Sequence, residues 1–182
     1  MPEFYYAGIG SRETPKYVLE YFNRLGSWMA LGNFVLRSGH ADGADKAFEY
    51  GCDCVAGRKE IYLPWRGFNG SNSSYILSSQ EAYDVAKQYH PYWSNLSDAA
   101  KKLQARNSHQ ILGHNLRTPS DLVICWTKDG LGQGGTGQAI RIAKDCDIPV
   151  IDAGSYGMNL NSFERDLVNL VEHIRNNKGM SD

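Results

Sequence analysis

The sequence has no excess of charge of either sign, no long apolar run and no signal-like N-terminus. Its 19 Lys and Arg residues face 20 Asp and Glu residues, which leaves a net charge of -1. Sequence-independent affinity for phosphate needs a surplus of basic residues, so this balance excludes a general nucleic-acid coat or a polybasic membrane binder. No run approaches the roughly 18 apolar residues of a membrane helix. The start Met-Pro-Glu-Phe lacks the basic-then-apolar order of a signal peptide. We therefore expect a cytoplasmic protein with no membrane partner.

Cysteine is also scarce, with 4 residues in 182. They are Cys52, Cys54, Cys125 and Cys146. This spacing matches neither a zinc ribbon nor a thioredoxin motif, so we predict free thiols. His40 and Asp42 stand in one loop without a third ligand, and we predict neither a metal nor a cofactor.

Buried strands and amphipathic helices alternate along the chain, joined by short glycine loops. The strands are expected at residues 4–10, 33–37, 59–63, 121–126 and 148–151. The helices are expected at residues 15–32, 44–55, 80–89, 97–112 and 162–175, with a further helix that follows the glycine loop 130–137 and runs to about residue 145. This alternation predicts an α/β fold, a Rossmann-like three-layer sandwich with a mostly parallel sheet. We expect a single domain over residues 1–176 and a disordered tail over 177–182. Residues 64–79 have an irregular composition that suggests a lid.

Glycine is the residue present in excess, with 19 of 182 positions. Three glycine clusters directly follow predicted strands, at residues 8–10, 39–43 and 130–137. In a parallel sheet these loops meet at the carboxyl edge, where such folds bind ligands. Glycine allows the backbone to approach a ligand closely, and free N–H groups at helix N-termini favour an anion. The clusters therefore predict a ligand that carries phosphate.

Two common phosphate motifs are absent. The first loop lacks the third glycine of the dinucleotide fingerprint, because that position is Glu13. No Gly-Lys-Ser/Thr sequence of a Walker A loop occurs either. A conventional NAD dehydrogenase and a P-loop NTPase are thus disfavoured.

The order GIGSR (8–12), RSGHADGAD (37–45), ARN (105–107), DLVICW (121–126) and GQGGTGQAIRIAKDCDIPV (132–150) resembles a known superfamily. This is the superfamily of DNA-processing protein A (DprA) and the LOG-type nucleotide phosphoribohydrolases. The resemblance to DprA implies a pocket for single-stranded DNA phosphates, formed by Gly10, Ser11, Arg12, Ser38, Gly39, Gly43, Asp45, Arg106, Asn107, Gly134, Gly135 and Thr136. To these we add Arg37, which flanks the second loop, and Gly137, the last glycine of the third loop. We expect Asp45 to orient its glycine loop by accepting backbone hydrogen bonds.

The LOG branch implies a different outcome, since its motif Gly-Gly-x-Gly-Thr-x-x-Glu ends in a glutamate that helps to cleave an N-glycosidic bond. In this sequence that position is Arg141. An arginine would oppose the positive charge that develops in the transition state. Glu81 or Asp45 could supply the carboxylate instead. We therefore predict no catalytic residue, and the question of enzymatic activity stays open.

The sequence thus predicts a phosphate-anchored nucleotide or single-stranded-DNA-binding protein, a DprA-like core without the C-terminal module of that family. The alternatives are a nucleoside-monophosphate N-glycosidase and a sensor or carrier of a nucleotide-derived small molecule. Aromatic residues in or beside the irregular segments either stack on a base or pack a lid onto the sheet edge: Trp65, Phe68, Tyr75, Tyr92 and Trp93. A homo-oligomer is expected from the resemblance alone. Residues 99–120 contain four Lys or Arg and no acid, which provides a focused basic segment around Arg106.

Overall fold

The computed structural model describes residues 3–77 and 79–179. The strands are β1 (Phe4–Gly8), β2 (Phe34–Ser38), β3 (Lys59–Leu63), β4 (Tyr75–Ile76), β5 (Leu122–Cys125) and β6 (Val150–Asp152). The helices are α1 (Lys16–Leu31), α2 (Ala44–Cys54), α3 (Gln80–Tyr89), α4 (Asp98–Leu112), α5 (Gly134–Asp145) and α6 (Leu160–Gly179). The expected alternation of strands and helices is confirmed.

The six strands form one sheet in the order β4-β3-β2-β1-β5-β6, and all neighbours are parallel. From β1 the chain first adds strands on one side, through β2 and β3 to β4. It then returns to the other side of β1 to add β5 and β6. The strand order therefore reverses between β1 and β5, and such a switch point opens a crevice at the carboxyl ends of the two strands.

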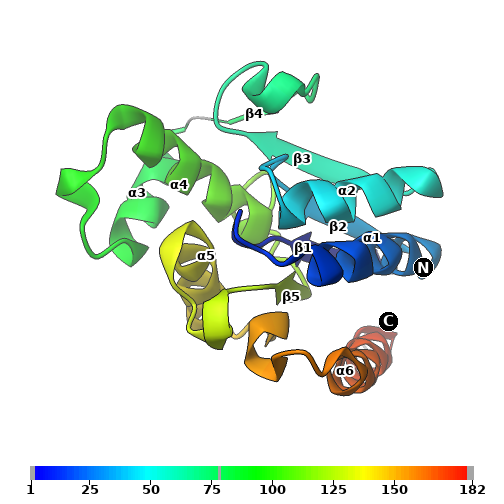
Figure 1. The fold of residues 1–182 in the computed structure, drawn as a ribbon. Coiled ribbons are helices and arrows are strands. Elements are labelled where there is room, and N and C mark those ends of the chain that lie inside the picture. Colours follow the sequence, from blue (N-terminus) through cyan, green and yellow to red (C-terminus); the bar gives the residue numbers. More distant parts are fainter. Residues whose placement is uncertain (1–2, 78, 180–182) are drawn as a thin grey trace.

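Helices cover both faces of the sheet, which confirms the three-layer α/β sandwich (Figure 1). The side chains of Tyr6, Leu36 and Ile124 point to one face and pack in a core with α1, α2 and α6. Ala7 and Val123, their neighbours in sequence along β1 and β5, point to the other face and pack against α4 and α5. This alternation follows from the two-residue period of a strand.

The helix that carries the basic segment has a defined start and end. The Ser97 hydroxyl accepts a hydrogen bond of 3.2 Å from the N–H of Ala100, which caps the N-terminus of α4. Gly113 ends the helix with a φ of 80°, a left-handed conformation that glycine adopts without strain. α4 is thus held against the sheet with one side facing the β1–β5 crevice.

Two expectations about irregular segments need correction. The segment 64–79 contains a short edge strand, β4, because Tyr75 and Ile76 pair with Tyr62 and Leu63. The last helix continues to Gly179, so the first three residues of the expected disordered tail are helical. Residues 180–182 lie outside the described part of the chain. No helix in the described ranges has the length and apolar character to cross a lipid bilayer.

Candidate phosphate-binding pocket

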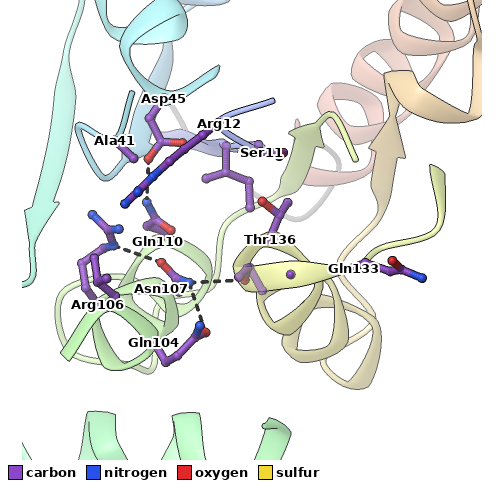
Figure 2. A pocket seen from close by; sticks show the side chains of 16 residues that line it. Ser11, Arg12, Ala41, Asp45, Gln104, Arg106, Asn107, Gln110, Gln133 and Thr136 are labelled. Carbon is purple, nitrogen blue, oxygen red and sulfur yellow. Dashed lines mark hydrogen bonds between the residues drawn. The ribbon is translucent and has the colours of Figure 1, made fainter. Parts of the chain in front are cut away.

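A pocket of about 320 Å³ opens at the carboxyl ends of β1 and β5, at the switch point of the sheet. Figure 2 shows its lining side chains, which come from the loops after β1 and β2, from the first turn of α2, from α4, and from α5 with the residue before it. The lining residues are Ile9, Gly10, Ser11, Arg12, Ala41, Asp45, Leu103, Gln104, Arg106, Asn107, Gln110, Gln133, Gly134, Gly135, Thr136 and Ala139. We call this site the α4–α5 pocket.

The loop after β1 contributes Gly10, Ser11 and Arg12. The N–H of Ser11 donates to the carbonyl of Trp126 at 3.2 Å, which ties this loop to the end of β5. A Cβ at Gly10 would lie 2.6 Å from the Cβ of Ala44, so glycine permits the loop to lie against α2. The exposed side chain of Arg12 has no carboxylate within ion-pair distance among residues 3–77 and 79–179. Its guanidinium is therefore available to a ligand.

The loop after β2 is organised by Asp45, whose side chain is buried. Its Oδ2 accepts a hydrogen bond of 3.1 Å from the N–H of Gly39, and the N–H of Ala41 also donates to this carboxylate. Burial raises the pKa of Asp45, while the charge of Arg106 and these N–H groups act in the opposite direction. Asp45 thus holds the loop, in the role expected from its position.

Arg106 lies on α4 with only 5% of its surface exposed. Its Nη1 donates to the carbonyl oxygens of Gly39 and Tyr62, and its guanidinium carbon lies 5.5 Å from the centroid of Phe68. Burial lowers the pKa of Arg106 to about 10, and the nearby Arg12 acts in the same direction, while Asp45 opposes both. The side chain therefore stays cationic at neutral pH.

Asn107 connects this buried cation to the next wall of the pocket. Its Oδ1 accepts a hydrogen bond of 3.0 Å from Nε of Arg106, and its Nδ2 donates to the carbonyl of Gly135 at 3.3 Å (Figure 2). Nδ2 also lies 3.4 Å from Oε1 of Gln104. The amide of Asn107 thus sets the orientation of Arg106 relative to α5.

The N-terminus of α5 forms the wall opposite Arg106, through Gly134, Gly135 and Thr136. The first turn contains no acidic residue, and no side chain caps it. The first N–H groups of a helix have no partner within the helix, and the aligned peptide dipoles favour negative charge there. Together with Arg12 and Arg106, this helix start makes the pocket suitable for an anion.

Nine of the fourteen predicted site residues line the pocket. They are Gly10, Ser11, Arg12, Asp45, Arg106, Asn107, Gly134, Gly135 and Thr136. The other five, Arg37, Ser38, Gly39, Gly43 and Gly137, lie outside its lining.

Arg37 is the main correction. Its side chain is 2% exposed and has structural partners: Nε donates to Glu60 at 2.7 Å and Nη1 to the carbonyl of Thr118 at 2.6 Å. The guanidinium carbon also lies 3.9 Å from the ring centroid of Tyr5. Arg37 is the penultimate residue of β2, and its side chain is used within the fold. We therefore assign it a structural role.

The remaining four residues shape the loops around the pocket. The Ser38 hydroxyl donates to the carbonyl of Gly8 at 2.6 Å. A Cβ at Gly39 would lie 2.2 Å from Nη1 of Arg106, and one at Gly137 would lie 1.9 Å from the carbonyl of Gly132. Gly43 precedes α2 with a φ of 92°. The three glycines therefore act through backbone geometry, and Ser38 acts through its side-chain hydroxyl.

Sequence reasoning missed three glutamines and several apolar residues of the lining. Gln104 and Gln110 lie on α4 together with Leu103, and Gln133 precedes α5. Helical spacing from Arg106 and Asn107 could have found the residues on α4, because Leu103 and Gln110 are three and four positions from Arg106 and Gln104 is three from Asn107. Gln133 lies before α5, and no helical spacing in the sequence marks it as a lining residue.

The aromatic candidates and one of the two candidate carboxylates, Glu81, lie outside the pocket lining. None of Trp65, Phe68, Tyr75, Tyr92 and Trp93 lines the α4–α5 pocket. Arg141 also lies outside it, where its Nε donates to the carbonyl of Tyr89 at 2.9 Å. Glu81 pairs with Arg117 at 2.9 Å, which leaves Asp45 as the carboxylate in the lining.

The fold is a Rossmann-like α/β core with a pocket at the switch point of its parallel sheet. The structure is similar to that of the Chlamydomonas rheinhardtii Moco carrier protein, with a TM-score of 0.55, 16% sequence identity and coverage of 85% of this chain and 77% of that chain. It is also similar to DNA processing protein A from Helicobacter pylori, described for its single-stranded DNA binding, with a TM-score of 0.54, 19% identity and 82% of this chain covered. The chain spans 64% of that protein. No family model and no curated protein matches the sequence.

Proposed function

We propose that the α4–α5 pocket binds a phosphorylated ligand of the nucleotide class, either a free nucleotide or one nucleotide of a single strand. The phosphate would lie at the N-terminus of α5, between Arg12 and Arg106. Thr136 would supply a hydroxyl to the phosphate, and Ser11, whose N–H is held by Trp126, lines the same pocket. Residues Gly10, Asn107, Gly134 and Gly135 complete the proposed binding site.

The observation that carries this proposal is the state of Arg106. The cation is buried, and Asp45, the carboxylate that attracts it, forms no ion pair with it, because no carboxylate lies within 4.0 Å of Arg106 in the described parts of the chain. A buried charge is costly unless it is paired. The backbone carbonyls of Gly39 and Tyr62 offset part of that cost, and a bound phosphate would complete the pairing.

The size and lining of the pocket support a ligand of one nucleotide. Small-molecule sites typically have volumes of roughly 300–1,000 Å³, and this pocket lies at the lower end with about 320 Å³. Three glutamines offer paired donors and acceptors, which suit the polar edge of a base or a related heterocycle. A carrier of a nucleotide-derived small molecule is the second candidate, because the same compact pocket would hold one such molecule. The two similar structures, one a DNA-binding protein and one a carrier, accord with both candidates.

We favour binding without hydrolysis. The motif position that carries glutamate in LOG enzymes is Arg141, which contacts Tyr89 outside the pocket. The remaining carboxylate, Asp45, is engaged by the backbone of its own loop and by Gln110 at 3.5 Å. Incubation with nucleoside monophosphates and chromatography for free base tests this point. Release of a base that is abolished by Asp45→Asn would establish the glycosidase alternative.

We also infer a cytoplasmic location from the four free cysteines. Self-association is proposed from the resemblance only. Light scattering of the purified protein at several concentrations tests it, and a constant monomer mass would reject it.

The central experiment compares ligands with and without phosphate by calorimetry. Nucleoside 5′-monophosphates should bind, and the matching nucleosides should not. Hydrogen bonds to charged groups are worth about 1.5–3 kcal/mol, so Arg12→Ala should weaken binding roughly ten- to hundredfold. Arg165→Ala, which removes an exposed arginine on α6, is the matched control and should bind as the wild type does. Equal affinity for nucleoside and nucleotide would reject the proposal.

A further inference from the structure

A second hollow, of about 260 Å³, lies between α3 and the first turns of α4. Its lining consists of two aromatic rings, two lysines, one carboxylate and one amide: Tyr83, Trp93, Lys87, Lys101, Asp84 and Gln80. We call it the α3–α4 hollow. None of these residues belongs to the α4–α5 pocket.

Trp93 forms a fixed aromatic surface in this hollow. Its half-buried ring packs against the small cluster of Ala82, Ala86 and Ala105. The ring of Tyr83 meets it edge-on, with 6.2 Å between centroids and an interplanar angle of 82°. Because these contacts already restrict the indole, a base that stacks on it would cost little additional side-chain entropy.

Two lysines, Lys87 and Lys101, line the hollow together with Trp93. The Nζ of Lys101 lies 5.9 Å from the centroid of the Trp93 ring. Neither Lys87 nor Lys101 forms an ion pair with any described residue. Asp84, the carboxylate of the lining, accepts a hydrogen bond of 2.8 Å from Gln80. The lining therefore carries one net positive charge next to an aromatic ring, a combination that suits a phosphate and a base.

The hollow borders the pocket along α4. Lys101 lines the hollow and Gln104, three residues later, lines the pocket. Side chains three apart on a helix are neighbours, with about 5–6 Å between Cβ atoms. A nucleic-acid strand that extends out of the pocket past Gln104 therefore reaches Lys101 next.

We propose that the α3–α4 hollow is a second nucleotide subsite, which binds the neighbouring nucleotide of a single strand held in the α4–α5 pocket. The base stacks on Trp93, and the phosphate between the two nucleotides is bound by Lys101, with Lys87 beyond it. This inference rests on the proposed function of the pocket, and it selects single-stranded nucleic acid as the ligand over a free mononucleotide.

The test uses thymidine 5′-monophosphate and a 5′-phosphorylated thymidine hexamer as probes. The wild type should bind the hexamer more tightly than the monophosphate. Loss of a stacked base should weaken the hexamer roughly tenfold in Trp93→Ala, while affinity for the monophosphate stays unchanged. Trp93→Phe retains a stacking ring and should recover most of the affinity. Lys101→Ala should reduce the dependence of log K on log salt by about 0.7 for the hexamer, because one phosphate contact is lost.

The controls separate this inference from the proposed function. Trp28→Ala removes an indole on α1 that is 42% exposed, and it should affect neither probe. If the wild type binds neither probe, the proposed function fails. If it binds both with equal affinity, or if Trp93→Ala leaves hexamer binding unchanged, the second subsite is rejected and the pocket stands. Circular dichroism of each variant confirms that the fold is intact.

Discussion

The Nε of Arg106 donates a hydrogen bond of 3.0 Å to Oδ1 of Asn107, its neighbour in the chain. Through its Nδ2 the same amide reaches the carbonyl of Gly135 at the start of α5. One side chain thus fixes a buried cation relative to the helix terminus that faces it. The geometry of the proposed anion site therefore depends on a residue that carries no charge itself.

The hydrogen bonds of Asn107 predict how strongly two substitutions at this position weaken nucleotide binding. Asn107→Ala removes the acceptor for Nε, and a hydrogen bond to a charged group is worth about 1.5–3 kcal/mol, so nucleotide affinity should fall roughly tenfold or more. Asn107→Asp keeps that acceptor but adds a negative charge beside Arg106. It should weaken phosphate binding further than alanine does, because the carboxylate competes with the ligand for the cation. Calorimetry with a nucleoside monophosphate measures both, and a higher affinity for the aspartate variant would contradict an anion site.

Two glycines of α5 provide a matched pair of variants. A Cβ at Gly135 would meet Gln104 and Asn107 at 3.6 and 3.8 Å, which are ordinary contacts, whereas a Cβ at Gly137 would lie 1.9 Å from the backbone oxygen of Gly132. Gly137→Ala must therefore displace the glycine loop. We expect a loss of about 1–3 kcal/mol in unfolding free energy from this overpacking, together with weaker ligand binding. Gly135→Ala should unfold at the wild-type denaturant midpoint or slightly above it. Equal denaturant midpoints for the two variants would show that a Cβ at Gly137 does not displace the glycine loop.

The glycine loops and the mostly parallel sheet could be predicted from the sequence, because both depend on local signals. Each cluster follows an apolar run, and a parallel sheet brings the ends of its strands to one edge. The prediction that Arg37 binds phosphate was wrong, because successive side chains of a strand point to opposite faces. Arg37 lies within β2, so its direction is set by the strand, and its partners Thr118 and Glu60 are distant in sequence. The loop begins two residues later, at Gly39.

Arg37→Met tests the structural assignment of that residue. The change removes the cation that pairs with Glu60, whose side chain is 17% exposed. It also leaves the carbonyl of Thr118 without the hydrogen bond from Arg37. Breaking a buried pair costs roughly 3–5 kcal/mol, and the partial exposure of Glu60 places the expected loss at or below the lower end. Denaturant unfolding measures the loss. Folded protein should bind nucleotide with wild-type affinity, since Arg37 lies outside the pocket lining. A stable variant with impaired binding would instead return Arg37 to the phosphate site.

His109 predicts how stability depends on pH. Its ring is 2% exposed, Nδ1 lies 3.0 Å from the carbonyl of Gly113, and Nε2 has no hydrogen-bond partner among the described residues. Burial lowers the pKa of His109 below its ordinary value of 6.5, with a smaller effect in the same direction from His114. The unfolded chain therefore binds the proton more readily than the folded one. Stability from this residue is fully present above pH 6.5 and is lost as the pH falls toward the lower, folded-state pKa.

His109→Asn is the variant that isolates this effect. Its amide can still donate to the carbonyl of Gly113, but it cannot take up a proton in this range. We expect the variant to be less stable than the wild type at pH 7.5, because it loses the ring that stacks on Tyr62 at a centroid distance of 5.6 Å. Between pH 7.5 and 5.0, however, its unfolding free energy should fall less than that of the wild type. Urea unfolding at both pH values measures the two differences. Parallel losses in the two proteins would show that His109 is not protonated on unfolding in this range, and would reject the assignment of a buried neutral imidazole.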